Sequence, residues 1–289
     1  MSDIISRVLS HAPVDTRYVG GLWHPGRASL RGLWTEARVL GASLTAPMNR
    51  DVGKFLIISR ARSGSTLLTQ LLNSHPQVRC DREVLARRVL FPRAYLNRLA
   101  HKNTATAYGA KLLSYQMAQV QRFRDPAGFL AGLGQDGFRF IHLQRDTFAQ
   151  TVSLAMAQSR RFFHQKTDPG AGVGKHIPET EAKKARAPVQ VDVEDFIRRL
   201  EWNDMLLDYE RHCLRDLPHL VIAYETGLQS PEAQQQTADQ VFDWIGVPAA
   251  PVSGGLKKTL PPDPTAMIAN YDALATQMRQ RGLDRLLPA

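Results

Sequence analysis

The stretch from Phe55 to Asn73 constrains the fold of this chain more than any other. Residues Phe55–Ile58 form an unbroken apolar run, which is typical of a parallel strand buried on both faces. Leucines then repeat with helical spacing and predict an amphipathic helix, at Leu67, Leu68, Leu71 and Leu72. This succession of strand, tight turn and helix predicts an α/β fold, a single P-loop-like domain whose central parallel sheet is flanked by helices.

The turn between this strand and this helix has the composition of an anion-binding loop: Arg62, Ser63, Gly64, Ser65 and Thr66. It directs backbone N–H groups and a helix N-terminus toward one point, where a phosphate or sulfate would be held. A Walker loop for nucleoside triphosphates requires Gly-Lys-Ser/Thr, but Gly64 is followed by Ser65, so the phosphate-binding lysine is missing. Arg62 supplies the cation instead, through a planar guanidinium that can donate two parallel hydrogen bonds. The alternative is a plain strand-to-helix turn with a serine cap.

A second motif of the same kind follows later in the chain. Residues Phe138–Gln144 predict another strand, and Arg145 comes directly after it. Ser153 follows eight residues later, on the next predicted helix. Open α/β sheets bind ligands at the carboxyl ends of their strands, so Arg145 is expected at that edge.

These two motifs resemble those of sulfotransferases that use 3′-phosphoadenosine 5′-phosphosulfate (PAPS). The resemblance is carried by Arg62–Leu68, His75-Pro76, Val78–Cys80 and Glu83, and it is greatest to tyrosylprotein sulfotransferases and bacterial carbohydrate sulfotransferases of the nodulation-factor type. It extends from about Phe55 to Tyr271 and is strong at the two motifs. It implies that Arg62–Thr66 binds the 5′-phosphosulfate and that Arg145 and Ser153 bind the 3′-phosphate. It also implies that Glu83, 21 residues after Arg62, is the catalytic base.

Further residues match the family more loosely. Gly109–Leu113 resembles a segment with an active-site lysine, which implies a catalytic role for Lys111, and Leu256–Leu260 resembles a basic loop that closes over the 3′-phosphate. In that loop Lys257 and Lys258 are equal candidates. The implied reaction passes a sulfuryl group to a hydroxyl, releases adenosine 3′,5′-bisphosphate and needs no metal. His142, interpreted as a core residue, and His164 are reserve candidates for the base.

The rest of the chain predicts one domain over residues 51–289, preceded by an N-terminal extension over residues 1–50. The extension is expected to pack on the domain or on a partner subunit, and the second case would make the protein a homo-oligomer. An interfacial membrane anchor is the weaker alternative. A long helix is predicted from Val193 to His212, and a late strand is matched to Val221–Glu225. Residues 164–190, rich in Gly, Pro, Lys and Glu, are interpreted as a mobile loop over the acceptor or as disorder.

Composition narrows the function classes. The net charge of +10 suits a donor with several anionic groups, and the spread of the basic residues argues against nucleic-acid binding. Two cysteines give neither a disulfide framework nor a zinc site. No membrane span or signal peptide is apparent, so we expect a cytoplasmic, bacterial-type enzyme, with peripheral membrane contact left open.

The acceptor is assigned from the two branches of the family that the sequence resembles. A carbohydrate or glycolipid is the first choice and a peptide tyrosine the second; another small-molecule hydroxyl remains an alternative. Two other classes are a P-loop small-molecule kinase and a non-catalytic nucleotide-binding scaffold. The missing Walker lysine favours PAPS over ATP.

Overall fold

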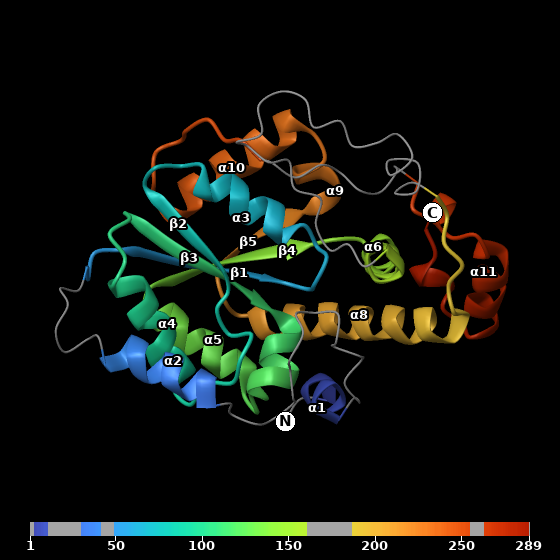
Figure 1. The fold of residues 1–289 in the computed structure, drawn as a ribbon, viewed down its shortest axis with the longest axis horizontal. Coiled ribbons are helices and arrows are strands. Elements are labelled where there is room, and N and C mark those ends of the chain that lie inside the picture. Colours follow the sequence, from blue (N-terminus) through green and yellow to red (C-terminus); the bar gives the residue numbers. More distant parts are fainter. Residues whose placement is uncertain (1–2, 11–29, 42–48, 161–186, 255–262, 289) are drawn as a thin grey trace. The chain divides into compact units, whose positions relative to one another are not determined.

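The computed structural model describes residues 3–10, 30–41, 49–160, 187–254 and 263–288 (Figure 1). The chain divides into two compact units. The first comprises Met1–Gln144 and Met205–Gly254, and the second comprises Arg145–Asp204 and Gly255–Ala289. The predicted boundary after residue 50 stays a prediction, and the loop predicted at 164–190 lies almost entirely outside the described residues.

The first unit is built on a five-stranded, all-parallel sheet with strand order β2-β3-β1-β4-β5. Its strands are β1 (Gly53–Ser59), β2 (Val78–Glu83), β3 (Ala107–Leu113), β4 (Phe138–Gln144) and β5 (His219–Ala223). Helices flank the sheet, so the predicted fold class is confirmed (Figure 1).

Strand β1 lies at the centre of this sheet, between β3 and β4. Its apolar run Phe55–Ile58 is completely buried, as its composition predicts. After β1 the chain turns toward β2, whereas after β4 it continues toward β5 on the opposite side. The carboxyl end of β1 is therefore a topological switch point, where open α/β sheets bind their ligands.

Helices cover both faces of the sheet in Figure 1. On one face lie α3 (Ser65–Asn73), α9 (Tyr224–Gly227) and α10 (Pro231–Ile245), and on the other lie α4 (Pro92–His101) and α5 (Pro126–Gln135). A π-helical segment, η3 (Gln116–Gln121), follows β3 and packs against α1 (Asp3–Ser10).

Helix α2 (Leu30–Gly41) is attached to the start of α4 by one buried carboxylate. Glu36 accepts hydrogen bonds from the backbone N–H groups of Leu90 (2.8 Å) and Phe91 (2.6 Å). Because a helix N-terminus carries partial positive charge, the Glu36 carboxylate stabilises α4 as well as joining the two helices.

The second unit is helical and has its own apolar core. It contains α6 (Thr147–Arg160), the first part of α8 (Val193–Leu214), α11 (Tyr271–Gln280) and two short turns, η4 (Thr265–Met267) and η5 (Asp284–Leu286). Phe148 and Val152 of α6 pack with Phe196 and Leu200 of α8 and with Leu274 of α11.

Most predicted elements are confirmed. The strands at Phe55–Ile58 and Phe138–Gln144 and the helix from Val193 are present. The late strand predicted at Val221–Glu225 instead begins and ends two residues earlier, at His219–Ala223. Tyr224 and Glu225 belong to helix α9. The short match Val-Ile-Ala-Tyr-Glu contains both the end of the strand and the start of the helix, and only strand pairing separates them.

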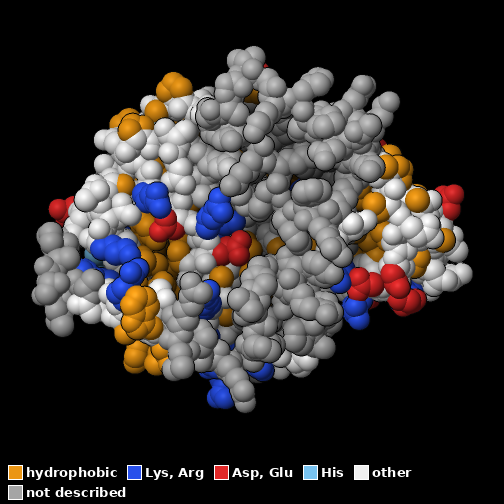
Figure 2. Space-filling model, viewed as in Figure 1, with side chains coloured by type: hydrophobic (Ala, Val, Ile, Leu, Met, Phe, Trp, Pro, Cys, Tyr) orange, Lys and Arg blue, Asp and Glu red, His pale blue; other side chains and the backbone are white. Residues whose placement is uncertain are grey.

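No helix among the described residues is long and apolar enough to cross a membrane. On the face shown in Figure 2, Lys and Arg side chains of the described residues occur in several groups, some of which lie next to Asp or Glu side chains.

Candidate functional site

The loop between β1 and α3 has two residues in the left-handed region of backbone conformation. Arg62 has φ 66° and Gly64 has φ 93°, on either side of Ser63. A residue with a Cβ pays roughly 1–2 kcal/mol for this conformation, so the placement of Arg62 stores strain in the loop. Alternation of this kind turns successive N–H groups toward a common centre, which is the geometry of an anion-binding nest.

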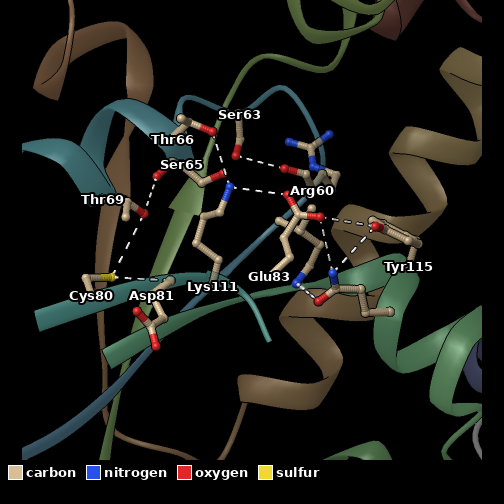
Figure 3. Close-up of polar contacts among 12 residues, drawn as sticks. Arg60, Ser63, Ser65, Thr66, Thr69, Cys80, Asp81, Glu83, Lys111 and Tyr115 are labelled. Atoms are coloured by element: carbon tan, nitrogen blue, oxygen red, sulfur yellow. Dashed lines mark hydrogen bonds and ion pairs between the residues drawn. The ribbon is translucent and has the colours of Figure 1, made fainter. Parts of the chain in front are cut away.

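The interior of the loop is held by Ser63. Its buried hydroxyl donates a hydrogen bond to the carbonyl oxygen of Arg60 (2.9 Å), so the Ser63 side chain supports the loop (Figure 3). Gly64 is the N-cap residue of α3 and has no side chain that could cap the helix. The first N–H groups of α3, beginning at Ser65, therefore stay available to an anion.

Lys111 connects this helix start to the predicted base. It lies on β3 in register with Ile57 of β1 and Glu83 of β2, and its side chain is 4% exposed. Its Nζ donates to Thr66 Oγ1 (3.2 Å) and to Glu83 Oε1 (3.3 Å), as Figure 3 shows. A buried ammonium group thus lies between the N-terminus of α3 and a carboxylate.

Glu83 reaches Lys111 because β2 contains an irregularity. The register of β2 against β3 shifts between Asp81 and Glu83, so Arg82 is an extra residue and Glu83 takes the place opposite Lys111. Such bulges change the direction in which a side chain points and are common beside active sites. Glu83 ends the strand rather than following it, and its side chain is 30% exposed.

The other oxygen of Glu83 accepts hydrogen bonds from two residues, Tyr115 and Gln116, that follow strand β3. The hydroxyl of Tyr115 (3.4 Å) and the amide of Gln116 (3.5 Å) both donate to Glu83 Oε2. Burial, and then the nearby Glu83 charge, raise the pKa of Tyr115, so its hydroxyl stays protonated and acts as a donor. Neither residue was predicted, because their approach to Glu83 depends on the turn into the π-helical segment.

Cys80, near the site in the sequence, is not suited to nucleophilic catalysis. Its side chain is buried, and its sulfur lies 3.9 Å from Thr69 Oγ1. Burial raises the pKa of Cys80 to about 12, so the thiol stays protonated at neutral pH. The chemistry of this site therefore depends on cations, hydroxyls and a carboxylate.

The remaining predicted residues are not all part of this cluster. Arg145 and Ser153 belong to the second unit, where Ser153 is buried on α6, so their role toward the loop stays a prediction. Lys257, Lys258 and His164 lie outside the described residues. His142 is buried in β4, as its interpretation as a core residue anticipated.

The assembled residues can hold an anion and accept a proton within one small volume. Backbone N–H groups and Lys111 lie at the start of α3, and the Glu83 carboxylate beside Lys111 has the chemistry of a base. This combination suits transfer of an anionic group to a hydroxyl.

Comparison with known proteins agrees with this geometry. Residues 55–128 match the model of the Sulfotransferase family. The match contains the loop, Glu83 and Lys111, so the candidate site lies in the segment that is similar to this family. No curated protein matches the sequence.

Two solved structures are similar at low identity. A sulfotransferase from Alicyclobacillus acidocaldarius is 14% identical with a TM-score of 0.40, and the alignment covers 78% of this chain and 95% of that one. A mouse sulfotransferase complexed with PAP is 14% identical with a TM-score of 0.41, covering 90% of this chain and 92% of that one. Similarities this distant carry no argument about substrate or mechanism.

Proposed function

We propose that this protein transfers a sulfuryl group from PAPS to an acceptor hydroxyl. One observation carries the proposal: within the segment that matches the sulfotransferase family, Lys111 contacts both the N-terminal turn of α3 and the carboxylate of Glu83. An anion site and a base are thereby adjacent, as direct transfer to a hydroxyl requires.

The residues of the first unit fit the anionic end of such a donor. The left-handed conformations of Arg62 and Gly64, the uncapped start of α3 and the buried Lys111 would hold the 5′-phosphosulfate. In the second unit, Arg145 and Ser153 are proposed to bind the 3′-phosphate, and either Lys257 or Lys258 is proposed to assist them. The expected independence of a metal ion stays part of the proposal.

Each side chain has a distinct task in this reaction. Bound PAPS would supply the sulfuryl group and a bisphosphate leaving group. Glu83 accepts the proton of the acceptor hydroxyl as its oxygen bonds to sulfur and the bond from sulfur to the phosphate oxygen breaks. Arg62, Lys111 and the first N–H groups of α3 stabilise the charge that develops on the oxygens around sulfur.

Glu83 is oriented for this task from both sides. Lys111 fixes Oε1, while Tyr115 and Gln116 fix Oε2. An ionised carboxylate has about four lone-pair sites, so these three donors leave room for one hydrogen bond from an acceptor hydroxyl. The acceptor would enter on the exposed side of Glu83.

The acceptor class rests on sequence resemblance. A hydroxyl on a carbohydrate or glycolipid is proposed first, because the resemblance includes the bacterial carbohydrate branch. Tyrosine in a peptide is proposed second, because Val78–Cys80 and Glu83 resemble the tyrosylprotein branch.

Radiolabelled PAPS supplied with a panel of acceptors tests the proposal. The panel would contain oligosaccharides, a glycolipid, a tyrosine peptide and small phenols, and mass spectrometry would identify the product. We expect a sulfated product with PAPS and none with ATP. Phosphorylation from ATP would support a kinase, and binding of PAPS without turnover on any acceptor would support a nucleotide-binding scaffold.

A further inference from the structure

A second arginine next to the loop, Arg60, is buried in the protein beside a carboxylate of α8. Arg60 follows β1 directly and is completely buried, with 0% of its surface exposed. Its Nε lies 3.9 Å from Oε2 of Glu210, a residue of α8 that is also 0% exposed. A fully buried ion pair therefore lies at the base of the loop.

Two residues of β4 complete this cluster. His142 Nε2 lies 3.0 Å from the same Glu210 oxygen, and Gln144 Nε2 lies 3.1 Å from His142 Nδ1. The imidazole of His142 thus links Gln144 to the carboxylate of Glu210. Arg60 is the guanidinium beside the same carboxylate.

The energetics of this pair are asymmetric. A charge in a protein interior is unfavourable unless it is paired, so removal of Glu210 alone would take the carboxylate at 3.9 Å away from the buried Arg60 guanidinium. Replacement of both residues by apolar ones of similar volume is often tolerated, because no charge then stays buried. A single substitution should therefore be more harmful than the double one.

A displacement of Arg60 would change the conformation of the anion-binding loop, because the two are joined by a hydrogen bond. The Arg60 carbonyl accepts the hydrogen bond of Ser63, and Ser63 lies between the two left-handed residues Arg62 and Gly64. If Arg60 leaves the interior to find water, that carbonyl shifts and the loop loses its internal support. Strained loop conformations persist only where surrounding contacts enforce them.

We propose that Glu210 is a positioning residue for the anion-binding loop, acting through Arg60. Glu210 holds Arg60 in the interior, Arg60 holds Ser63, and the loop keeps the conformation that presents its N–H groups to the donor. This inference rests on the proposed function for the identity of the donor, but the conformation of the loop can be measured without it.

A double-mutant cycle tests the proposal. The variants are Arg60→Met, Glu210→Met and the combination of both, with Leu130→Ala as a control. Leu130 is completely buried in α5, so its truncation lowers stability without touching the ion pair. Two quantities are measured: hydrogen–deuterium exchange of peptides that cover residues 60–66, and the affinity for adenosine 3′,5′-bisphosphate.

Glu210→Met is expected to accelerate exchange in the loop and to weaken binding of the bisphosphate about tenfold, and the double variant should recover most of both losses. Leu130→Ala should lower the melting temperature without selective exchange in the loop. If Glu210→Met does not fold, Glu210→Gln, which keeps the shape and removes the charge, takes its place in the cycle.

The inference is overturned if the single variants exchange in the loop as Leu130→Ala does, or if the double variant loses the sum of the two single losses. Failure of the wild-type protein to bind the bisphosphate would instead contradict the proposed function. In that case the exchange data still decide whether Glu210 positions the loop.

Discussion

At the scale of single residues, Glu83 is defined by its hydrogen-bond donors. Lys111 binds one carboxylate oxygen, and Tyr115 and Gln116 bind the other. These contacts restrict the orientation of the carboxylate. A base held in this way depends on its position relative to the acceptor hydroxyl.

Glu83→Gln is expected to keep affinity for PAPS and to lower turnover by roughly 10²–10⁴-fold, if general-base catalysis is the role of Glu83. The amide keeps the size of the side chain but cannot accept the proton. Donor affinity measured by calorimetry and turnover with labelled PAPS separate the two effects.

Asp81→Asn is the matched control for this variant. Asp81 lies on the same strand, but it contacts Arg79 and Tyr108 rather than Lys111. Its substitution should leave turnover close to that of the wild type. Near-normal turnover in a folded Glu83→Gln protein would remove Glu83 from the mechanism.

At the scale of elements, the turn from β1 into α3 depends on the absence of a side chain at residue 64. A Cβ on Gly64 would lie 2.5 Å from Cδ2 and 2.9 Å from Cε2 of Tyr224, and the φ of 93° is unfavourable for other residues. The turn thus has both a steric and a conformational requirement for glycine.

Gly64→Ala should destabilise the protein by at least about 1–2 kcal/mol, the usual cost of a left-handed alanine, and should weaken donor binding. Urea denaturation and a PAPS titration measure the two effects. The double variant Gly64→Ala/Tyr224→Ala removes the clash but keeps the backbone strain, so it should recover donor binding in part. Unchanged donor affinity in Gly64→Ala would show that the turn does not hold the donor.

The junction of α4 with the end of α5 depends on one carboxylate. Arg93 donates to both oxygens of Asp136, at 2.6 and 2.7 Å, and Asn97 donates to Oδ2 at 2.6 Å. The hydrogen bonds from Arg93 hold the pKa of Asp136 below its ordinary value of 3.8. A lowered folded-state pKa stabilises the protein above the unfolded pKa, and this contribution is lost as the pH falls through the folded value.

Asp136→Asn should therefore cost up to about 1 kcal/mol at pH 7, and the difference from the wild type should shrink below the pKa of 3.8. Urea denaturation of both proteins at neutral and acid pH checks this. Asp208→Asn is the control, because its contact with Arg211 is 3.6 Å long and exposed on both sides. A gap between Asp136→Asn and the wild type that persists unchanged in acid would contradict the assignment.

At the scale of the whole molecule, the residues assigned to the two anionic ends of the donor occur in different compact units. The loop, Glu83 and Lys111 belong to the first unit, whereas Arg145 and Ser153 belong to the second. The two assignments can therefore be tested separately.

Arg145→Ala is expected to abolish the preference for PAPS over the analogue without the 3′-phosphate, at a cost of about 1.5–3 kcal/mol in PAPS binding. Arg62→Ala should instead affect mainly turnover, because Arg62 is assigned to the transferring group. Competition binding with the two nucleotides measures the preference. If Arg145→Ala discriminates the 3′-phosphate as the wild type does, the assignment of Arg145 is wrong.

The sequence by itself was enough to predict the strand at Phe55–Ile58, the helix that begins near Ser65 and the strand at Phe138–Gln144. These elements depend on local patterns: a run of apolar residues, a helical repeat of leucines and a turn that contains Gly64. Sequence resemblance added Glu83 and Lys111, which the structure places 3.3 Å apart.

Only the tertiary structure decided how these residues meet. Glu83 faces Lys111 because an extra residue shifts the register of β2, and register depends on pairing between strands rather than on local sequence. Arg60 and Arg62 are two residues apart and of one type, yet Arg60 is buried against Glu210, more than a hundred residues later in the chain. Local pattern cannot separate two such arginines, because the difference is made by a counter-charge that only folding brings near.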